Sequence, residues 1–276
     1  MLFFIAWRCS GELLIGSLSI HLYSLFFALG LLSGGLLVIR LMGKHTSSQS
    51  YLIYAFLGIL IGARVGHCLF YEPNYYLNHI NEIFLPYRTI SGQRVFVGFS
   101  GLASHIGTLG LMISLYVFSL RNRMNYFSVC DVFAVATPLV GGFIRIGNLM
   151  NSEILGKATD MPWAFVFENI DAIPRHPAQL YEAIWYFLLF VALIFIYKSK
   201  KTKYFRYGFV TGLGLLGVSV FRFFIEFIKE PQEMFQNHMS LNMGQLLSLP
   251  FVMLGIVLVF FTSRNYRKSN LKFFSK

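Results

Sequence analysis

Charged and amide side chains interrupt an otherwise largely apolar stretch of the chain between Gly141 and Gly156, which reads GGFIRIGNLMNSEILG. They are Arg145, Asn148, Asn151 and Glu153. A guanidinium within the hydrocarbon of a membrane costs about 2.5–3.5 kcal/mol, so it normally faces a polar partner or a wet cavity. Arg145 and Asn148 are three residues apart and share one face of a helix. The spacing therefore indicates a polar site, although an arginine that snorkels from a helix end to the headgroups fits the same pattern.

Other polar residues fall at a similar depth in neighbouring apolar segments, assuming the orientation derived below. They are His21, Tyr23, Arg64, His67, His105, Arg175, His176, Gln179, Tyr181, Glu182, Arg222 and Glu226. Clustered guanidinium groups can hold a phosphate in a bidentate fork. A histidine beside such a cluster can serve as a base, because its ordinary pKa is about 6.5. The inventory predicts a polar, phosphate-binding cavity in the outer half of the membrane and no metal site, since the histidines and carboxylates lack metal-ligand spacing.

Two of these groups also have plain structural interpretations. Arg222 and Glu226 are four residues apart and could form an ion pair on one helix face. The segment from Arg175 to Gln179 reads as a helix start with Pro177 in its first turn. Such a start favours an anion, but an ordinary helix cap explains it equally well.

The elements that carry these residues are membrane spans. The chain has 276 residues, of which 56% are hydrophobic and only 13% charged, with a mean hydropathy of +0.61. Because a spanning helix needs about 20 apolar residues, seven spans can be drawn. They cover residues 20–42, 51–71, 96–120, 127–149, 178–197, 207–228 and 243–262.

The distribution of Lys and Arg gives the orientation of these spans. If the C-terminus is cytoplasmic, fourteen basic residues fall in inner segments and six in outer ones. Basic residues accumulate on the cytoplasmic side, so we expect the N-terminus outside and the C-terminus inside. The net charge of +11 then reflects membrane topology, and no nucleic-acid partner is expected.

The rest of the chain predicts one all-α transmembrane domain over residues 1–276. Residues 1–19 are too short and interrupted to span and fit an interfacial segment, and residues 1–16 make a poor signal peptide. The loops 72–95 and 150–177 are expected to form an ordered outer cap. Cys9, Cys68 and Cys130 are too few and scattered for a disulfide framework or a metal cluster.

Several segments together resemble the bacterial prolipoprotein diacylglyceryl transferases. The segment Arg145–Glu153 is similar to the family signature, and Arg175–Glu182 to a second signature. Further similar segments are Tyr23, Gly62–Gly66, Phe221–Glu226 and Met243–Gln245. These matches follow one another from about residue 20 to 262, so the resemblance covers nearly the whole chain.

The resemblance implies a seven-span enzyme of the bacterial inner membrane that needs no cofactor or metal. Such enzymes move the diacylglyceryl group of phosphatidylglycerol to the lipobox cysteine in the signal peptide of a preprolipoprotein, releasing glycerol phosphate. Arg145 and Arg222 would then bind the phosphate, and His105 would be the base for the thiol. The other implied substrate-binding residues are Tyr23, Arg64, Asn148, Glu153, Gly156, His176, Gln179 and Glu226.

Departures from the family pattern concern fine substrate preference rather than reaction class. The chain has His105-Ile106-Gly107 where His-Gly-Gly is usual, Val218 where a tyrosine precedes the second arginine, and a short loop at 157–174. Two other classes stay open on the residues alone. An anionic-lipid transporter or flippase would need a polar path to the inner side, and a lipid phosphatase would need a dedicated nucleophile or metal ligands.

Overall fold

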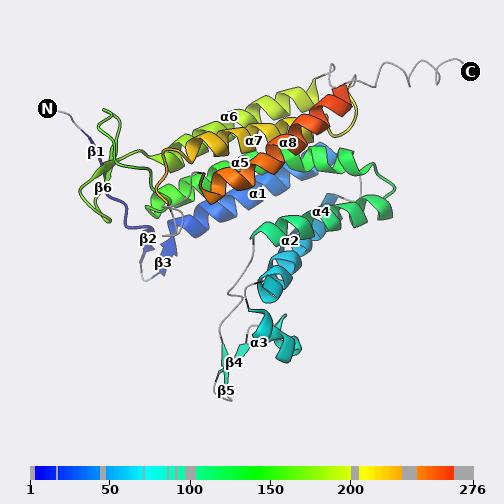
Figure 1. The fold of residues 1–276 in the computed structure, drawn as a ribbon, viewed down its shortest axis with the longest axis horizontal. Coiled ribbons are helices and arrows are strands. Elements are labelled where there is room, and N and C mark those ends of the chain that lie inside the picture. The colour runs from blue at the N-terminus through cyan, green and yellow to red at the C-terminus, as the bar shows by residue number, and fades with distance from the viewer. Residues whose placement is uncertain are drawn as a thin grey trace, which may run out of the picture. The chain divides into compact units, whose positions relative to one another are not determined.

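Seven long helices account for most of the computed structural model (Figure 1). The structure describes residues 4–16, 18–43, 48–70, 72–85, 87–90, 93–96, 104–199, 205–231 and 241–263. The long helices are α1 (Leu22–Met42), α2 (Ser48–Phe70), α4 (Ser104–Arg121), α5 (Tyr126–Met150), α6 (Ala178–Lys198), α7 (Phe209–Ile225) and α8 (Met243–Ser263). They coincide with the seven predicted ranges to within a few residues, except at the start of the third.

The third predicted span begins too early. Residue 96 ends strand β5 (Gln93–Phe96), which pairs antiparallel with β4 (Tyr87–Ile90), and α4 begins only at Ser104. The apolar Phe96, with which the predicted span begins, belongs to a hairpin in the structure. Hydropathy alone could not separate these two cases, because short apolar runs suit strands and helices alike.

Five of the described helices are long and apolar enough to cross a membrane: α1, α2, α5, α6 and α8. The described parts of α4 and α7 form shorter apolar helices over Ile106–Arg121 and Phe209–Ile225. The protein is thus a mostly helical, multi-pass membrane protein. The number of seven spans and the orientation of the termini stay predictions.

The chain folds as two compact units, and residues within each unit pack mainly against one another. Unit 1 comprises residues 1–41 and 130–276, and unit 2 comprises residues 42–129. The single domain expected from the sequence stays a prediction.

In unit 1, helices α6, α7 and α8 pack in sequence, with α5 alongside α6 (Figure 1). Glycine permits the close contact of α7 with α8, because a Cβ on Gly212 would lie 2.9 Å from a methyl group of Val259. Asp131 on α5 fixes the start of α7. Its carboxylate accepts hydrogen bonds from the backbone N–H groups of Gly208 and Thr211, each at 2.8 Å, and so satisfies helix donors that lack partners of their own.

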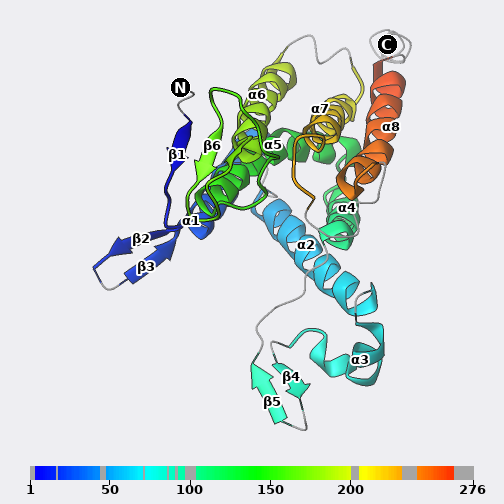
Figure 2. The same ribbon diagram turned by 60° about the vertical axis from the view of Figure 1, so that its left-hand side comes forward.

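A small sheet covers the end of α5 in unit 1. Strand β1 (Ile5–Trp7) pairs in parallel with β6 (Phe165–Phe167), which pairs antiparallel with β7 (Pro174–Arg175), and Figure 2 shows β1 beside β6. Phe165 and Phe167 pack against Leu149 of α5. The N-terminal segment predicted to be interfacial therefore contains a strand of this sheet. It also contains the hairpin of β2 (Glu12–Ile15) and β3 (Leu18–His21).

In unit 2, α2 and α4 form a tightly packed pair. A Cβ on Gly62 would lie 2.7 Å from the backbone oxygen of Ile106, so glycine is required for this approach. Between the two helices in sequence lie α3 (Pro73–Asn78), the 3₁₀ turn η1 (Ile80–Glu82) and the β4–β5 hairpin. The described parts of the two predicted cap segments contain short helices or strands, one segment in each unit, and an outer cap stays a prediction.

Candidate functional site

Arg145 and Asn148 lie on one face near the end of α5, as their spacing predicts. Arg145 Nη1 donates a hydrogen bond to Asn148 Oδ1 at 3.1 Å. The helix continues to Met150, so both side chains belong to its last two turns. The side chain of Arg145 is 15% exposed, which shows that it does not extend freely into the headgroup region from a helix end.

A buried carboxylate from α6 faces this arginine. Glu182 is fully buried, and its Oε2 lies 3.1 Å from Arg145 Nε. That oxygen nevertheless has no aligned hydrogen-bond donor. The contact is therefore an ion pair without a good hydrogen bond.

Lys229, just beyond α7, completes the environment of this carboxylate. Its ammonium nitrogen lies 3.0 Å from Glu182 Oε1 and 3.3 Å from Glu226 Oε1, and the residue is only 4% exposed. Asn242, which precedes α8, donates to the other oxygen of Glu226 at 3.0 Å. Buried charges are stable only when paired in this way, so the three ionised groups form one unit.

Glu182 and Lys229 were not among the predicted catalytic or substrate-binding residues. Glu182 was counted with the polar residues of the expected cavity but received no role, and Lys229 was counted only with the basic residues of the outer loops. The spacing of three residues between Glu226 and Lys229 was an available signal, because such a pair shares a face if the helix continues.

Arg222 differs from Arg145 in having no acidic partner. Within the described ranges, no carboxylate lies at ion-pair distance from its guanidinium, and Glu226 is bound to Lys229 and Asn242 instead. The ion pair between Arg222 and Glu226 that their spacing suggested is therefore not present in the structure. Tyr186 of α6 lies within electrostatic range of Arg145, Arg222 and Glu182, which places Arg222 beside the cluster.

The charges of this cluster leave a positive excess. Three cations (Arg145, Arg222 and Lys229) lie with two carboxylates (Glu182 and Glu226). An apolar surrounding makes such an excess costly unless an anion binds there. The cluster is thus suited to an anionic ligand with oxygen acceptors.

The chain leaves α5 through a strained turn. Ser152 and Ile154 have positive φ angles of 52° and 57°, which residues other than glycine rarely adopt. Gln179, buried at the start of α6, donates to the backbone oxygen of Glu153, and Asn151 Nδ2 donates to Glu153 Oε1 at 2.7 Å. Strain of this kind persists where the surrounding structure fixes it, often at a functional site.

Gly156 ends this turn against the residue before α6. A Cβ there would lie 2.4 Å from the backbone oxygen of His176, so only glycine fits. The Gly156 N–H donates to the same oxygen at 3.1 Å. The glycine thus joins the end of α5 to the start of α6.

His176 lies two residues before α6 and contacts a side chain of that helix. Its Nδ1 lies 3.4 Å from the Tyr181 hydroxyl, which accepts a hydrogen bond from Trp163 Nε1 at 2.8 Å. Burial lowers the pKa of His176 below its usual value, because desolvation disfavours the charged ring. A neutral imidazole can accept a proton.

The start of α6 carries no free arginine. Helix α6 begins at Ala178, the first residue of the predicted span, and Pro177 is its N-cap residue rather than part of the first turn. Arg175 is buried and bound to Asp171 at 2.6 Å and to Glu230. The hydrogen bonds to Asp171 and Glu230 raise the pKa of Arg175, and the hydrogen bond from Arg175 lowers the pKa of Asp171.

Tyr23 reaches α5 from the first turn of α1. A Cβ on Gly147 would lie 3.1 Å from the Tyr23 ring, so the ring packs on the helix between Arg145 and Asn148 in sequence. Tyr23 therefore lies beside α5 at Gly147, and its role in substrate binding stays a prediction.

The remaining predicted residues belong to unit 2. Arg64 is buried, and its Nε donates to the Ile83 carbonyl at 2.6 Å, while Nη2 contacts the Tyr76 hydroxyl and the Glu82 carbonyl, each at 3.3 Å. His105 lies in the first turn of α4, and its side chain is outside the described structure. That Arg64 and His105 share one cavity with the cluster stays a prediction.

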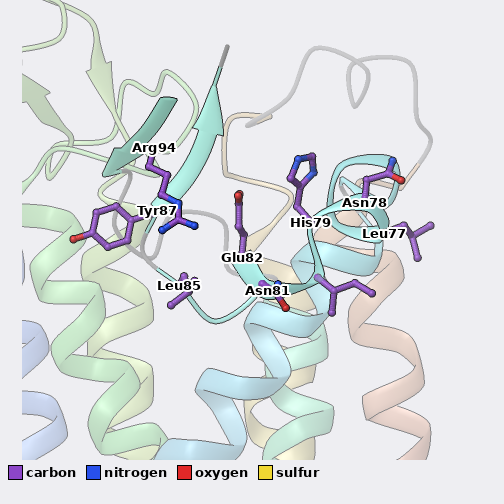
Figure 3. A pocket seen from close by; sticks show the side chains of 9 residues that line it. Leu77, Asn78, His79, Asn81, Glu82, Leu85, Tyr87 and Arg94 are labelled. Atoms are coloured by element: carbon purple, nitrogen blue, oxygen red, sulfur yellow. The ribbon is translucent and has the colours of Figure 1, made fainter. Parts of the chain in front are cut away.

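Unit 2 also contains an open pocket of about 420 Å³ beneath the β4–β5 hairpin (Figure 3). His79, Glu82, Tyr87 and Arg94 are among the residues that line it. Glu82 is occupied by Tyr75 and by Thr89, whose hydroxyl groups each donate at 2.6 Å. Among the described residues that line the pocket, the one carboxylate is therefore already hydrogen-bonded within the protein.

Comparison with known proteins identifies the family. Residues 12–261 match the family model described as prolipoprotein diacylglyceryl transferase. A phosphatidylglycerol–prolipoprotein diacylglyceryl transferase of Bacteroides fragilis is 51% identical over 95% of this chain and 96% of its own length. Proteins of the same name from Tolumonas auensis and Porphyromonas gingivalis are 41% and 38% identical, covering 91% and 88% of the chain and 94% and 89% of their own lengths. The chain belongs to the prolipoprotein diacylglyceryl transferase family.

Proposed function

We propose that this protein transfers the diacylglyceryl group of phosphatidylglycerol to the lipobox cysteine thiol of preprolipoproteins. Its relatives carry the names of these two substrates. The observation that carries the proposal to the residues is the excess of cations over carboxylates around Arg145 and Arg222. A phosphodiester headgroup has the charge and the oxygen acceptors that this cluster lacks.

The reaction is a nucleophilic substitution at the carbon of the diacylglyceryl group that bears the phosphate. The thiol sulfur forms a bond to this carbon, the bond from carbon to the phosphate oxygen breaks, and glycerol phosphate leaves. The thiol proton passes to a base. A free thiol has a pKa of about 8.5 and the thiolate is the nucleophile, so proton removal is part of the catalysis.

Each group of the site has a role in this scheme. Arg145 and Arg222 bind the phosphate and stabilise the charge that it gains on leaving. His105 takes the thiol proton. Tyr23, Asn148, Glu153, Gly156, His176, Gln179 and Glu226 form the surrounding substrate site, and a role for Arg64 in substrate binding stays a prediction from the sequence. Both substrates are held in one membrane, which supplies much of the positioning.

The scheme requires the site to open on the outer side of the bacterial inner membrane. We infer seven spans, with the N-terminus outside and the C-terminus in the cytoplasm, from the asymmetry of Lys and Arg. Cysteine labelling of intact cells, in a chain without Cys9, Cys68 and Cys130, tests this topology. Positions near 80, 165 and 235 should react from outside, whereas positions near 46, 122 and 202 should not.

The activity itself is tested with purified full-length protein, phosphatidylglycerol and a synthetic lipobox peptide. We expect the peptide mass to increase by one diacylglyceryl group and glycerol phosphate to be released. A peptide with serine in place of the lipobox cysteine is the control and should remain unmodified. Glycerol phosphate released without peptide, and only when a divalent metal is present, would instead indicate a lipid phosphatase.

A further inference from the structure

Lys229 is the most deeply buried cation of the cluster, and the proposed reaction gives it no role. Its backbone is fixed on both sides by the strained turn after α5. The Lys157 N–H donates to the Ile228 oxygen at 2.7 Å, and the Glu230 N–H donates to the Leu155 oxygen at 3.1 Å. Gly156 and Lys229 form an antiparallel bridge between these two bonds. The Lys229 side chain therefore extends from a fixed backbone segment, and its ammonium group lies at a defined place.

The ammonium group of Lys229 lies between two carboxylates. Lys229 Nζ is 3.0 Å from Glu182 and 3.3 Å from Glu226, while Arg145 lies on the far oxygen of Glu182. Without the ammonium group, Arg145 would be the nearest described cation for Glu182, and Glu226 would keep only the neutral Asn242. Both carboxylates would then compete with a phosphate for the two arginines.

We propose that Lys229 is a positioning residue that neutralises Glu182 and Glu226 and thereby keeps Arg145 and Arg222 available for the phosphate of the lipid substrate. This inference rests on the proposed function. It differs from a direct role in binding, because Lys229 acts through the carboxylates. Its charge matters and its shape does not, provided that it reaches both acids.

Four variants of the full-length protein test the proposal in detergent: Lys229→Met, Lys229→Arg, Glu226→Gln, and the double variant with Lys229→Met and Glu226→Gln. Lys229→Met should lower kcat/KM for phosphatidylglycerol by about tenfold or more, as expected for coupled buried charges. The loss should lie in KM for the lipid, with KM for the peptide unchanged. Lys229→Arg should retain most of the activity, because it keeps the charge.

The double variant separates positioning from direct contact. Removing one carboxylate together with the lysine restores the local charge balance, so the double variant should be no worse than Lys229→Met alone. Losses that simply multiply would overturn the proposal and indicate that Lys229 contacts the substrate. Lys157→Met is the matched control, because Lys157 is exposed in the adjacent segment and should tolerate the change.

Phosphatidylglycerol retention, measured by native mass spectrometry, separates this proposal from the proposed function. If wild-type protein binds this lipid but transfers nothing, the proposed reaction is wrong. Weaker lipid retention by Lys229→Met would still support the proposed role of Lys229. Equal retention and turnover in wild type and Lys229→Met would overturn it. If Lys229→Met does not accumulate, Lys229→Arg decides: full turnover supports a charge role, and a folded but inactive variant contradicts it.

Discussion

Arg64 in unit 2 and Arg145 in unit 1 both lie in long apolar helices, but their guanidinium groups make different contacts. In unit 2, Arg64 is buried and donates to backbone carbonyl oxygens of residues 82 and 83 and to the Tyr76 hydroxyl. In unit 1, Arg145 faces the carboxylate of Glu182, which it shares with Lys229. Carbonyl acceptors are fixed by the backbone, so the contacts of Arg64 secure a loop. Charged side-chain partners make Arg145 part of an electrostatic cluster.

The comparison shows that an arginine in a membrane segment does not by itself identify a substrate site. The groups around the guanidinium decide whether it is suited to bind a substrate. Arg64 donates to the backbone carbonyl oxygens of residues 82 and 83 and to the Tyr76 hydroxyl, whereas Arg145 and Arg222 lie where cations outnumber carboxylates. A phosphate can bind at the second place without displacing backbone hydrogen bonds.

The largest effect is expected from Arg145→Lys. Lysine keeps the charge but loses the planar fork that can hold two phosphate oxygens. Because a charge-assisted hydrogen bond contributes roughly 1.5–3 kcal/mol, turnover should fall about ten- to a hundredfold. Turnover per folded molecule, measured in detergent with phosphatidylglycerol and a lipobox peptide, tests this. Near-wild-type turnover would remove the phosphate clamp from the proposed mechanism.

Arg222→Lys should cause a similar or somewhat smaller loss of turnover, while the protein still accumulates. Arg222 has no acidic partner among the described residues, so its role in folding should be small. Glu226→Gln provides the contrast, because Glu226 compensates Lys229 in the buried cluster. Its main effect should be a lower thermal stability. A nearly silent Arg222→Lys would contradict a role in phosphate binding.

Arg64→Lys should act mainly on the outer segment of unit 2. It removes donors to the carbonyls of residues 82 and 83, so residues 72–96 should become more sensitive to limited proteolysis. Turnover per folded molecule should stay within about threefold of wild type, a difference below 1 kcal/mol. If turnover falls as far as in Arg145→Lys without faster cleavage, Arg64 binds substrate, as the sequence predicts.

The smallest effect concerns acid stability of the same segment. Hydrogen bonds from Thr89 and Tyr75 lower the pKa of Glu82 to about 2, below its ordinary value of 4.5. A depressed folded pKa stabilises the fold above the unfolded value, and this contribution is lost as the pH falls through the folded pKa. Pepsin cleavage within 72–96 should therefore accelerate between about pH 4.5 and 2.

Glu82→Gln is the control for this acid effect. The substitution removes the titrating group, so cleavage of the variant should be faster above pH 4.5 and should change less with pH. Equal pH profiles for the wild type and the variant would show that another group controls the opening of this segment.

The sequence alone determined which segments form the long helices and which of them carry polar residues. Runs of about 20 apolar residues can bury their backbone only as helices in a membrane, so composition and period suffice. The prediction that Arg145 and Asn148 share a face was confirmed, because this depends only on helix periodicity. The family was also recognisable, since its motifs follow one another along the chain.

Only the tertiary structure decided which charges meet. Glu182 and Lys229 are 47 residues apart, and neither stands in a recognisable local motif with the other. Their contact depends on the packing of α6 beside α7 and on the bridge between Gly156 and Lys229. The same holds for Glu226, which the sequence paired with Arg222 by spacing, but which binds Lys229 and Asn242 in the fold. Helix periodicity fixes the direction of a side chain, whereas its partner depends on neighbouring elements that local sequence does not encode.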